Sequence, residues 1–158
     1  SAESVFVSDG GEFGQWTQAI VESTHRVING PSGSIGSGVP FALAARLASP
    51  EATVIATVGD GTFGFHAMEL ETAIRYDLPL VIVVGNDACW NAEYQIQLDD
   101  YGADRLVGCE RYSVTRRVGC VRHPLRVAVA PLHRHRDLPL PRVRASRHYR
   151  LTGRAGRL

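Results

Sequence analysis

Two short polar clusters carry the residues of this sequence best suited to chemistry. Gly59-Asp60-Gly61-Thr62 follows one apolar run, Asn86-Asp87 follows another, and 24 residues separate Gly61 from Asn86. Carboxylate oxygens are the ligands that Mg²⁺ and Ca²⁺ prefer, and glycine-flanked amides at the start of a helix bind phosphate. The two clusters therefore indicate a divalent cation held beside a diphosphate, since the cation offsets repulsion between that anion and an acidic protein.

The segments around these clusters predict how they meet. Residues 53–58 and 80–84 are continuous apolar and β-branched runs, as in strands buried on both faces of a sheet. A helix is expected over about residues 66–75, and strand, helix and strand at this spacing favour two parallel strands with a helical crossover. Ligands of such sheets bind beyond the carboxyl ends of the strands, where both clusters lie.

Upstream, the same alternation continues. Residues 5–8 predict a short strand that ends at the turn Asp9-Gly10-Gly11, and Trp16 and Ile20 recur at helical spacing. A loop rich in Gly and Ser over 29–38 precedes a helix expected over 39–47. The predicted fold class is α/β, a three-layer arrangement of a parallel sheet flanked by helices.

These motifs resemble a known family. Gly59-Asp60-Gly61 and Asn86-Asp87 are similar to the G-D-G…N-N signature of thiamine-diphosphate enzymes, in the branch of acetolactate synthases, pyruvate decarboxylases and 2-hydroxyacyl-CoA lyases. The family's G-[ST]-F…E-L-x-T-A and G-x-[MI]-G-x-G-[LV]-P segments are matched by Gly61-Thr62-Phe63, Glu69-Leu70, Thr72-Ala73 and Gly33-Ser34-Ile35-Gly36-Ser37-Gly38-Val39-Pro40. The resemblance covers residues 5–108, most of the family's C-terminal diphosphate-binding domain with its thiamine-diphosphate-binding fold.

The resemblance implies a metal site and two cofactors, thiamine diphosphate and Mg²⁺. Asp60, the side chain of Asp87 and the backbone carbonyl of Cys89 would hold Mg²⁺ on the diphosphate. Asp87 stands where the family usually has its second Asn, which keeps an oxygen ligand and adds one negative charge. No flavin is expected.

The remaining cofactor contacts also follow from the resemblance. Gly59, Gly61, Thr62 and the backbone amides near Phe63 would contact the phosphates. In the segment Gly33-Ser34-Ile35, the Gly33 carbonyl would accept a hydrogen bond from the 4′-amino group, and Ile35 would wedge the cofactor into its bent conformation. In that bend the amino group can take the proton of thiazolium C2.

One catalytic residue is carried over from the pyruvate decarboxylase branch. Glu93 lies six residues beyond Asp87, where that branch has a catalytic Glu, although residues 88–92 do not match the branch.

Several of these residues also have simpler interpretations. Asp60 could form a solvated turn, Ile35 could be core packing, and His66, Glu71 and Glu93 are typical of solvated helix faces. The glycines at 33, 36 and 38 do not form a nicotinamide-nucleotide fingerprint, because that requires G-x-G-x-x-G directly after a strand.

The function implied is a carboligase or lyase of the acetolactate synthase type, acting on a 2-oxo acid or a 2-hydroxyacyl (acyl-CoA) compound. The family's pyrimidine-binding Glu belongs to a preceding domain, usually supplied by a partner subunit, so we expect a fragment or one half of a split, homo-oligomeric enzyme that is inactive alone. The alternative is a truncated, non-catalytic fragment that binds cofactor weakly or not at all.

The charges divide the chain into two regions. Residues 1–110 contain four Arg and 15 acidic residues, a net charge of −11, whereas 111–158 contain 13 Arg and one acidic residue, a net charge of +12, and Lys is absent throughout. We expect the diphosphate-binding domain, incomplete, in 1–110 and a basic tail in 111–158, where four prolines leave no stable element to place.

Three interpretations of the tail stay open. Arg-rich segments bind nucleic acid, but this one has few aromatics and no recognisable module, so nucleic acid is not an expected partner. It could be a disordered extension, or the product of a frame change near Glu110, because Arg, Pro, His, Val and Gly dominate out-of-frame translations of GC-rich genes. We favour the frame change.

The composition also indicates where in the cell the protein is expected. No run of 18 apolar residues is present, so no spanning helix and no membrane partner are expected. Residues 1–9 lack the features of a secretion signal. Cys89, Cys109 and Cys120 are odd in number and lack C-x-x-C spacing, which is typical of reduced thiols in the cytoplasm.

Overall fold

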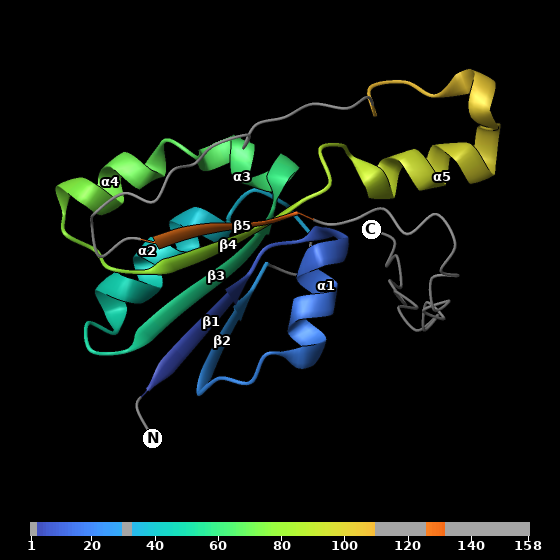
Figure 1. Ribbon diagram of the computed structural model, residues 1–158. Coiled ribbons are helices and arrows are strands. Elements are labelled where there is room, and N and C mark those ends of the chain that lie inside the picture. Colours follow the sequence, from blue (N-terminus) through green and yellow to red (C-terminus); the bar gives the residue numbers. More distant parts are fainter. Residues whose placement is uncertain (1–2, 30–32, 110–125, 132–158) are drawn as a thin grey trace, which may run out of the picture.

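The protein is a parallel α/β sheet flanked by helices, seen in a computed structural model that describes residues 3–29, 33–109 and 126–131 (Figure 1). All strand pairs are parallel, in the order β2-β1-β3-β4-β5. The strands are β1 (Ser4–Ser8), β2 (His25–Ile28), β3 (Thr53–Gly59), β4 (Val81–Asn86) and β5 (Arg126–Pro131). The helices are α1 (Gly11–Ile20), α2 (Gly38–Ala48), α3 (Asp60–His66), α4 (Glu69–Arg75) and α5 (Asn91–Tyr101), followed by the 3₁₀ turn η1 (Ala103–Arg105). The predicted fold class is confirmed.

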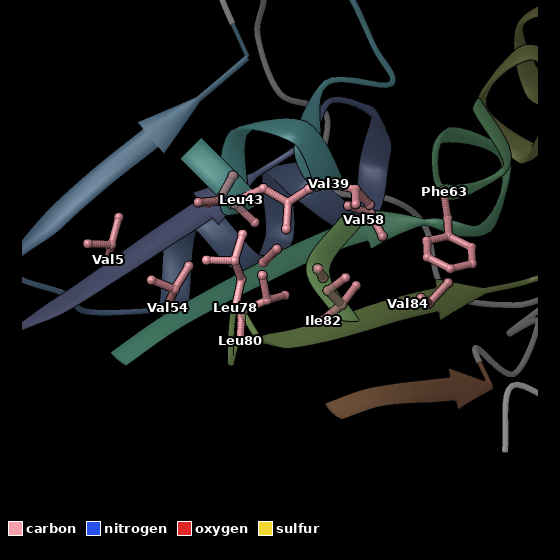
Figure 2. Close-up of a cluster of buried hydrophobic side chains, with 14 of the residues drawn as sticks. Val5, Val39, Leu43, Val54, Val58, Phe63, Leu78, Leu80, Ile82 and Val84 are labelled. Carbon is pink, nitrogen blue, oxygen red and sulfur yellow. The ribbon is translucent and has the colours of Figure 1, made fainter. Parts of the chain in front are cut away.

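One face of the sheet forms the main hydrophobic core. Because side chains alternate along a strand, every second residue of β3 points to this face, and these residues pack with Ile82 and Val84 of β4 against α2. Figure 2 shows the cluster along β1, β3 and β4 beneath α2. Its larger members are Val5, Val7, Val39, Leu43, Val54, Val58, Phe63, Leu78, Leu80, Ile82 and Val84.

The opposite face is covered by α1 through smaller and more polar contacts. Thr57 of β3 and Thr17 of α1 share a hydrogen bond of 2.9 Å between their hydroxyl groups, and both are buried. Gly14 lies so close to the end of β1 that a Cβ there would stand 2.0 Å from the Asp9 carbonyl oxygen. Backbone contact therefore fixes the distance between α1 and the carboxyl end of β1.

The order of the strands reverses between β1 and β3. The chain runs from β1 outward to β2 on one side and then from β3 to β4 on the other. The carboxyl ends of β1 and β3 meet at this reversal, the place where ligands of open α/β sheets bind. Asp9 follows β1 there, and Asp60 follows β3.

The helices differ in three places from the expectation. The helix predicted over about 66–75 corresponds to α4, which begins at Glu69, and a separate helix that was not predicted, α3, begins at Asp60 directly after β3 and ends at His66. The loop expected over 29–38 contains the start of α2 at Gly38. The helix α5 was not predicted, which agrees with its having no buried residue and extending away from the sheet (Figure 1).

The basic region contributes a strand, where the sequence allowed no stable element to be placed. Residues Arg126–Pro131 pair with β4 in parallel register, with Val127 opposite Ile82. The rest of 111–158 lies outside the described residues. The frame change stays a prediction: translating the gene's other two frames from codon 105 should reveal an in-register helix and strand in one of them, and their absence from both would rule it out.

Candidate functional site

The two polar clusters meet at the carboxyl edge of the sheet, as predicted. In the register of β3 and β4, Gly59 pairs with Gly85, so the residues that follow these two glycines leave the sheet at the same level. Gly85 has no room for a side chain, because a Cβ there would lie 2.4 Å from the ring of Phe13. The register and this close packing place Asp60 beside the segment Asn86-Asp87.

Asp60 is a buried carboxylate that joins the two clusters. Its side chain is at the first position of α3, and the residue is 4% exposed. Oδ1 accepts a hydrogen bond of 3.0 Å from the backbone N–H of Gly61, and Oδ2 accepts one of 3.0 Å from that of Ala88. The second bond ties the turn after β4 to the turn after β3.

The turn after β4 is stabilised by its own side chains. Asn86 Oδ1 accepts a 2.9 Å hydrogen bond from the N–H of Ala88, and Asp87 Oδ1 accepts a 3.2 Å bond from the N–H of Cys89. Ala88 has a φ of 59°, in the left-handed region that non-glycine residues rarely adopt. This strained backbone lies in the turn whose N–H at Ala88 also donates to Asp60.

The two carboxylates act on each other. Burial raises the pKa of Asp60 above its ordinary value, and the negative charge of Asp87 raises it further. The N–H groups of Gly61 and Ala88 lower this pKa and oppose part of the shift. Two acids brought this close in a partly desolvated place repel each other, and a divalent cation between them would remove the repulsion.

The start of α3 has space beside it. Thr62 is buried, and its Oγ1 donates a 3.1 Å hydrogen bond to the Gly59 carbonyl, while Phe63 is in the core. Gly59 has a φ of −72°, which any residue adopts, and an added Cβ would meet only Thr62 Oγ1, at 3.7 Å. The fold itself does not require glycine at 59, so the open space is available to a ligand.

The segment from Gly33 to Gly38 is positioned from two sides. Gly33 and Gly36 have positive φ values of 66° and 99°, and the Gly36 carbonyl is 2.7 Å from Nδ1 of His66, the last residue of α3. Ser34 is exposed, and Ile35 is 37% exposed, so neither is core packing. His66 is exposed at the end of α3, as expected for a solvated helix face, and its ring also contacts this segment.

A site residue that sequence reasoning missed is Asp9. The sequence predicts a turn at Asp9, yet this residue is 1% exposed and its carboxylate accepts hydrogen bonds from the N–H groups of Gly10, Gly36 and Gly38 at 2.7 to 3.1 Å. An Asp directly after a buried parallel strand and before Gly-Gly was the available signal, since Asp60 has the same relation to its own strand.

Three other residues singled out in the sequence have different surroundings. Glu93 is exposed in the first turn of α5, and Glu71 forms an exposed ion pair with Arg75. Cys89 is buried. A ring contact between Phe65 and Trp90, with centroids 5.9 Å apart, links the end of α3 to the start of α5.

The donor set fits a hard cation bound mainly through a ligand. Within the described residues no three His, Cys, Asp or Glu side chains gather as a metal site. Two carboxylates and a backbone carbonyl are the kind of partial set that binds Mg²⁺ when phosphate oxygens complete the shell. The raised pKa of Asp60 and the open space at Gly59 both agree with such an occupant.

In the part of the chain that the structure covers, none of the helices combines the length and the apolar character needed to cross a membrane.

Comparison with known proteins agrees with this geometry. Residues 9–119 match the family described as "Thiamine pyrophosphate enzyme, C-terminal TPP binding domain". The chain is 38% identical over 94 residues to the acetolactate synthase large subunit IlvG of Mycobacterium tuberculosis, and this alignment covers 58% of this chain and 17% of the relative. It is 36% identical over 111 residues to 2-hydroxyacyl-CoA lyase 2 of Xenopus laevis, and this alignment covers 68% of this chain and 17% of the relative. It is 34% identical over 108 residues to human 2-hydroxyacyl-CoA lyase 2, and this alignment covers 66% of this chain and 17% of the relative.

The chain thus spans about a sixth of the length of these curated relatives. The match covers both polar clusters and the Gly33–Gly38 segment, and it extends past Glu110, where the charge changes sign. By this match and by its parallel sheet, the chain belongs to the thiamine pyrophosphate enzymes, as their C-terminal TPP-binding domain.

Proposed function

We propose that this chain binds thiamine diphosphate together with Mg²⁺, with the diphosphate at the carboxyl ends of β3 and β4. Asp60, Asp87 and the backbone carbonyl of Cys89 hold the metal. The observation that carries this proposal is the burial of Asp60 beside a second carboxylate, two causes that both raise the pKa of Asp60. A cation coordinated by both acids turns that repulsion into attraction.

The phosphate oxygens lie beside the start of α3. Gly59 and Gly61 let the backbone approach closely, and the Thr62 hydroxyl and the amides near Phe63 donate to the phosphates. Thr62 Oγ1 lies over the open side of Gly59 and donates to its carbonyl, so rotation about one side-chain bond redirects this hydroxyl. The residues that bind phosphate are thus held by the same strand and helix that hold Asp60.

The thiamine part lies toward the segment Gly33-Ser34-Ile35. The Gly33 carbonyl accepts a hydrogen bond from the amino group of the pyrimidine, and the side chain of Ile35 supports the bent form of the cofactor. When bound in this form, thiamine diphosphate supplies a nucleophilic thiazolium carbon. The partial exposure of Ile35 supports this role, because an apolar side chain at the edge of a site is available to a ligand.

The reaction we propose is that of a carboligase or lyase acting on a 2-oxo acid or a 2-hydroxyacyl compound. The support is the similarity to proteins named acetolactate synthase and 2-hydroxyacyl-CoA lyase. Because the chain spans 17% of their length, we propose that a pyrimidine-binding domain or subunit completes the site in trans, in a homo-oligomeric enzyme. Glu93 is proposed as the catalytic acid of that complete site.

Calorimetric titration of the chain with thiamine diphosphate, with and without Mg²⁺, tests the binding proposal. We expect binding that depends on Mg²⁺, and no turnover of pyruvate until the pyrimidine-binding domain is added. Absence of binding under both conditions would favour the alternative, a truncated fragment without cofactor. Turnover by the chain alone would contradict the requirement for a second domain.

A further inference from the structure

Asp9 is the most completely buried carboxylate among the described residues that the site above leaves without a role. It follows β1 at the strand reversal, its own N–H donates a 3.0 Å hydrogen bond to the Thr57 carbonyl of β3, and 1% of the residue is exposed. The ion pairs of the described residues join Glu3 to His25 and Glu71 to Arg75, so within that part of the chain Asp9 meets no cation. Backbone amides balance its charge instead.

These amides belong to the segment that we assign to the thiamine part. Asp9 Oδ1 and Oδ2 both accept from the N–H of Gly36, at 3.0 and 3.1 Å, and Oδ2 also accepts from that of Gly38, at 2.9 Å. Gly38 must be glycine for this approach, because a Cβ there would stand 2.9 Å from Oδ2 and 2.7 Å from Val58. The carboxylate thus fixes the backbone immediately after Ile35.

The residue next to Asp9 fixes the side chain of Ile35. A Cβ on Gly10 would stand 2.7 Å from Ile35 Cγ2 and 2.6 Å from Nδ2 of Asn29. Ile35 therefore rests directly on the backbone of Gly10, in a place that only the absence of a side chain leaves open. Since Gly10 also donates to Asp9 Oδ1 at 2.7 Å, one short stretch of chain sets both the backbone and the side chain.

We propose that Asp9 is a positioning residue for the thiamine half of the cofactor: through Gly36 and Gly38 it holds Ile35 where the bent cofactor needs an apolar support. This inference rests on the proposed binding of thiamine diphosphate. It separates the site into two parts, a metal and diphosphate part built by Asp60, Asp87 and Thr62, and a thiamine part whose shape depends on Asp9.

The separation makes the test selective. Binding of inorganic diphosphate with Mg²⁺ uses the first part alone, whereas binding of thiamine diphosphate with Mg²⁺ uses both. In Asp9→Asn one of the two carboxylate oxygens is replaced by an NH₂ group, which cannot accept a hydrogen bond. In either orientation of the amide this NH₂ group faces the N–H of Gly10 or of Gly38, so at least one of these hydrogen bonds to residue 9 is lost. We expect affinity for thiamine diphosphate to fall at least tenfold while affinity for inorganic diphosphate changes less than twofold, both measured by calorimetry on the full chain with Mg²⁺.

Gly10→Ala provides a second variant that leaves the carboxylate in place. The φ of −71° and ψ of −175° at Gly10 suit alanine, but the new Cβ displaces Ile35, so the same selective loss is expected. Asp99→Asn on α5 makes the same charge change at an exposed position and should alter neither affinity. Hydrogen exchange of the Gly36 and Gly38 amides, measured by NMR, should quicken in Asp9→Asn relative to the amides of β3.

The outcomes distinguish this inference from the proposed function. If the unaltered chain binds neither probe, the proposed function fails before any variant is made, and the exchange of Gly36 and Gly38 still decides whether Asp9 anchors the segment. If Asp9→Asn and Gly10→Ala lose both probes in equal proportion, or keep both, the positioning role is wrong. Loss of thiamine diphosphate alone supports it, because general destabilisation would lower both affinities together.

Discussion

Asp9 and Asp60 occupy equivalent places at the ends of neighbouring strands, but their surroundings differ. The carboxylate of Asp9 accepts hydrogen bonds from the N–H groups of three glycines, at positions 10, 36 and 38. The carboxylate of Asp60 accepts hydrogen bonds from the N–H groups of Gly61 and Ala88, and the charge of Asp87 acts on it as well. Asp9 is 1% exposed and Asp60 is 4% exposed, so the degree of burial does not distinguish the two residues.

The two carboxylates differ in the groups that compensate their negative charge. A buried carboxylate costs several kcal/mol in lost hydration unless donors or cations replace the water. Around Asp9 the backbone supplies those donors in the folded chain itself. Around Asp60 the charge of Asp87 is added, and we propose that a bound cation offsets this repulsion. We therefore propose that Asp9 is a structural anchor and that Asp60 belongs to a binding site.

Gly14→Ala should produce the largest effect of these substitutions, because its new side chain would collide with the backbone of Asp9. The added Cβ would stand 2.0 Å from the Asp9 carbonyl oxygen and 3.2 Å from Ser8 Oγ, and a backbone atom cannot rotate away. We expect the free energy of unfolding to fall by about 3 kcal/mol, the upper part of the range for overpacking, as measured by urea denaturation.

Gly59→Ala is the matched control for Gly14→Ala. Its Cβ would meet only Thr62 Oγ1 at 3.7 Å, and its φ of −72° suits alanine, so its stability should stay within about 0.5 kcal/mol of the unaltered chain. Equal stabilities for the two variants would contradict a rigid attachment of α1 to the end of β1.

Asp60→Asn should give the next largest effect, on binding rather than on folding. The amide keeps the size of the side chain but removes the charge that we propose for the metal, and its NH₂ group opposes the N–H of Gly61 or of Ala88. We expect Mg²⁺-dependent affinity for thiamine diphosphate to fall about 100-fold, measured by calorimetry. Asp99→Asn should bind like the unaltered chain, and an Asp60→Asn variant with full affinity would place the metal elsewhere.

The buried parts of the fold could be predicted from the sequence because burial leaves a pattern. The runs 53–58 and 80–84 correspond to β3 and β4 within two residues, and their parallel pairing places Asp60 beside Asp87 as expected. The strand β2 was missed because it is an edge strand whose residues are mostly exposed. The helix α5 was missed because it lacks an apolar face, and β5 was missed because prolines and arginines surround it.

The role of Asp9 could not be predicted in the same way. Its partners at Gly36 and Gly38 are distant in sequence and contribute backbone N–H groups, which leave no side-chain signal. The sequence alone shows an Asp after a strand and two glycines, a pattern that a simple turn also produces. Only the crossover from β2 to α2 brings these amides to the end of β1.

Asp87→Asn should give a smaller and pH-dependent effect. Asp60 has a raised pKa in the folded chain, so the folded state holds this proton more tightly than the unfolded state does. Without metal, the free energy of unfolding therefore falls as pH rises from an ordinary carboxyl pKa of about 4 through the raised pKa of Asp60. Asn at 87 keeps an oxygen to accept the Cys89 N–H and removes the second cause of the raised pKa.

We expect two opposite consequences of Asp87→Asn. In EDTA, urea denaturation from pH 4 to pH 8 should show a shallower loss of stability than in the unaltered chain. With Mg²⁺, affinity for thiamine diphosphate should be about tenfold weaker, because one negative charge near the cation is lost. Identical pH profiles for the two proteins would mean that Asp87 and Asp60 do not interact strongly enough to matter for stability.

Glu93→Gln should have the smallest effect on this chain. Glu93 is exposed on α5, outside both carboxylate sites, so affinity for thiamine diphosphate should change less than about twofold and stability by less than about 0.5 kcal/mol. If Glu93 is the catalytic acid, its loss lowers turnover only after a pyrimidine-binding domain completes the site, because a proton donor matters only where a substrate binds. Comparing binding by the chain with turnover by the completed enzyme separates these roles, and a tenfold loss of cofactor affinity in Glu93→Gln would move the start of α5 into the cofactor site.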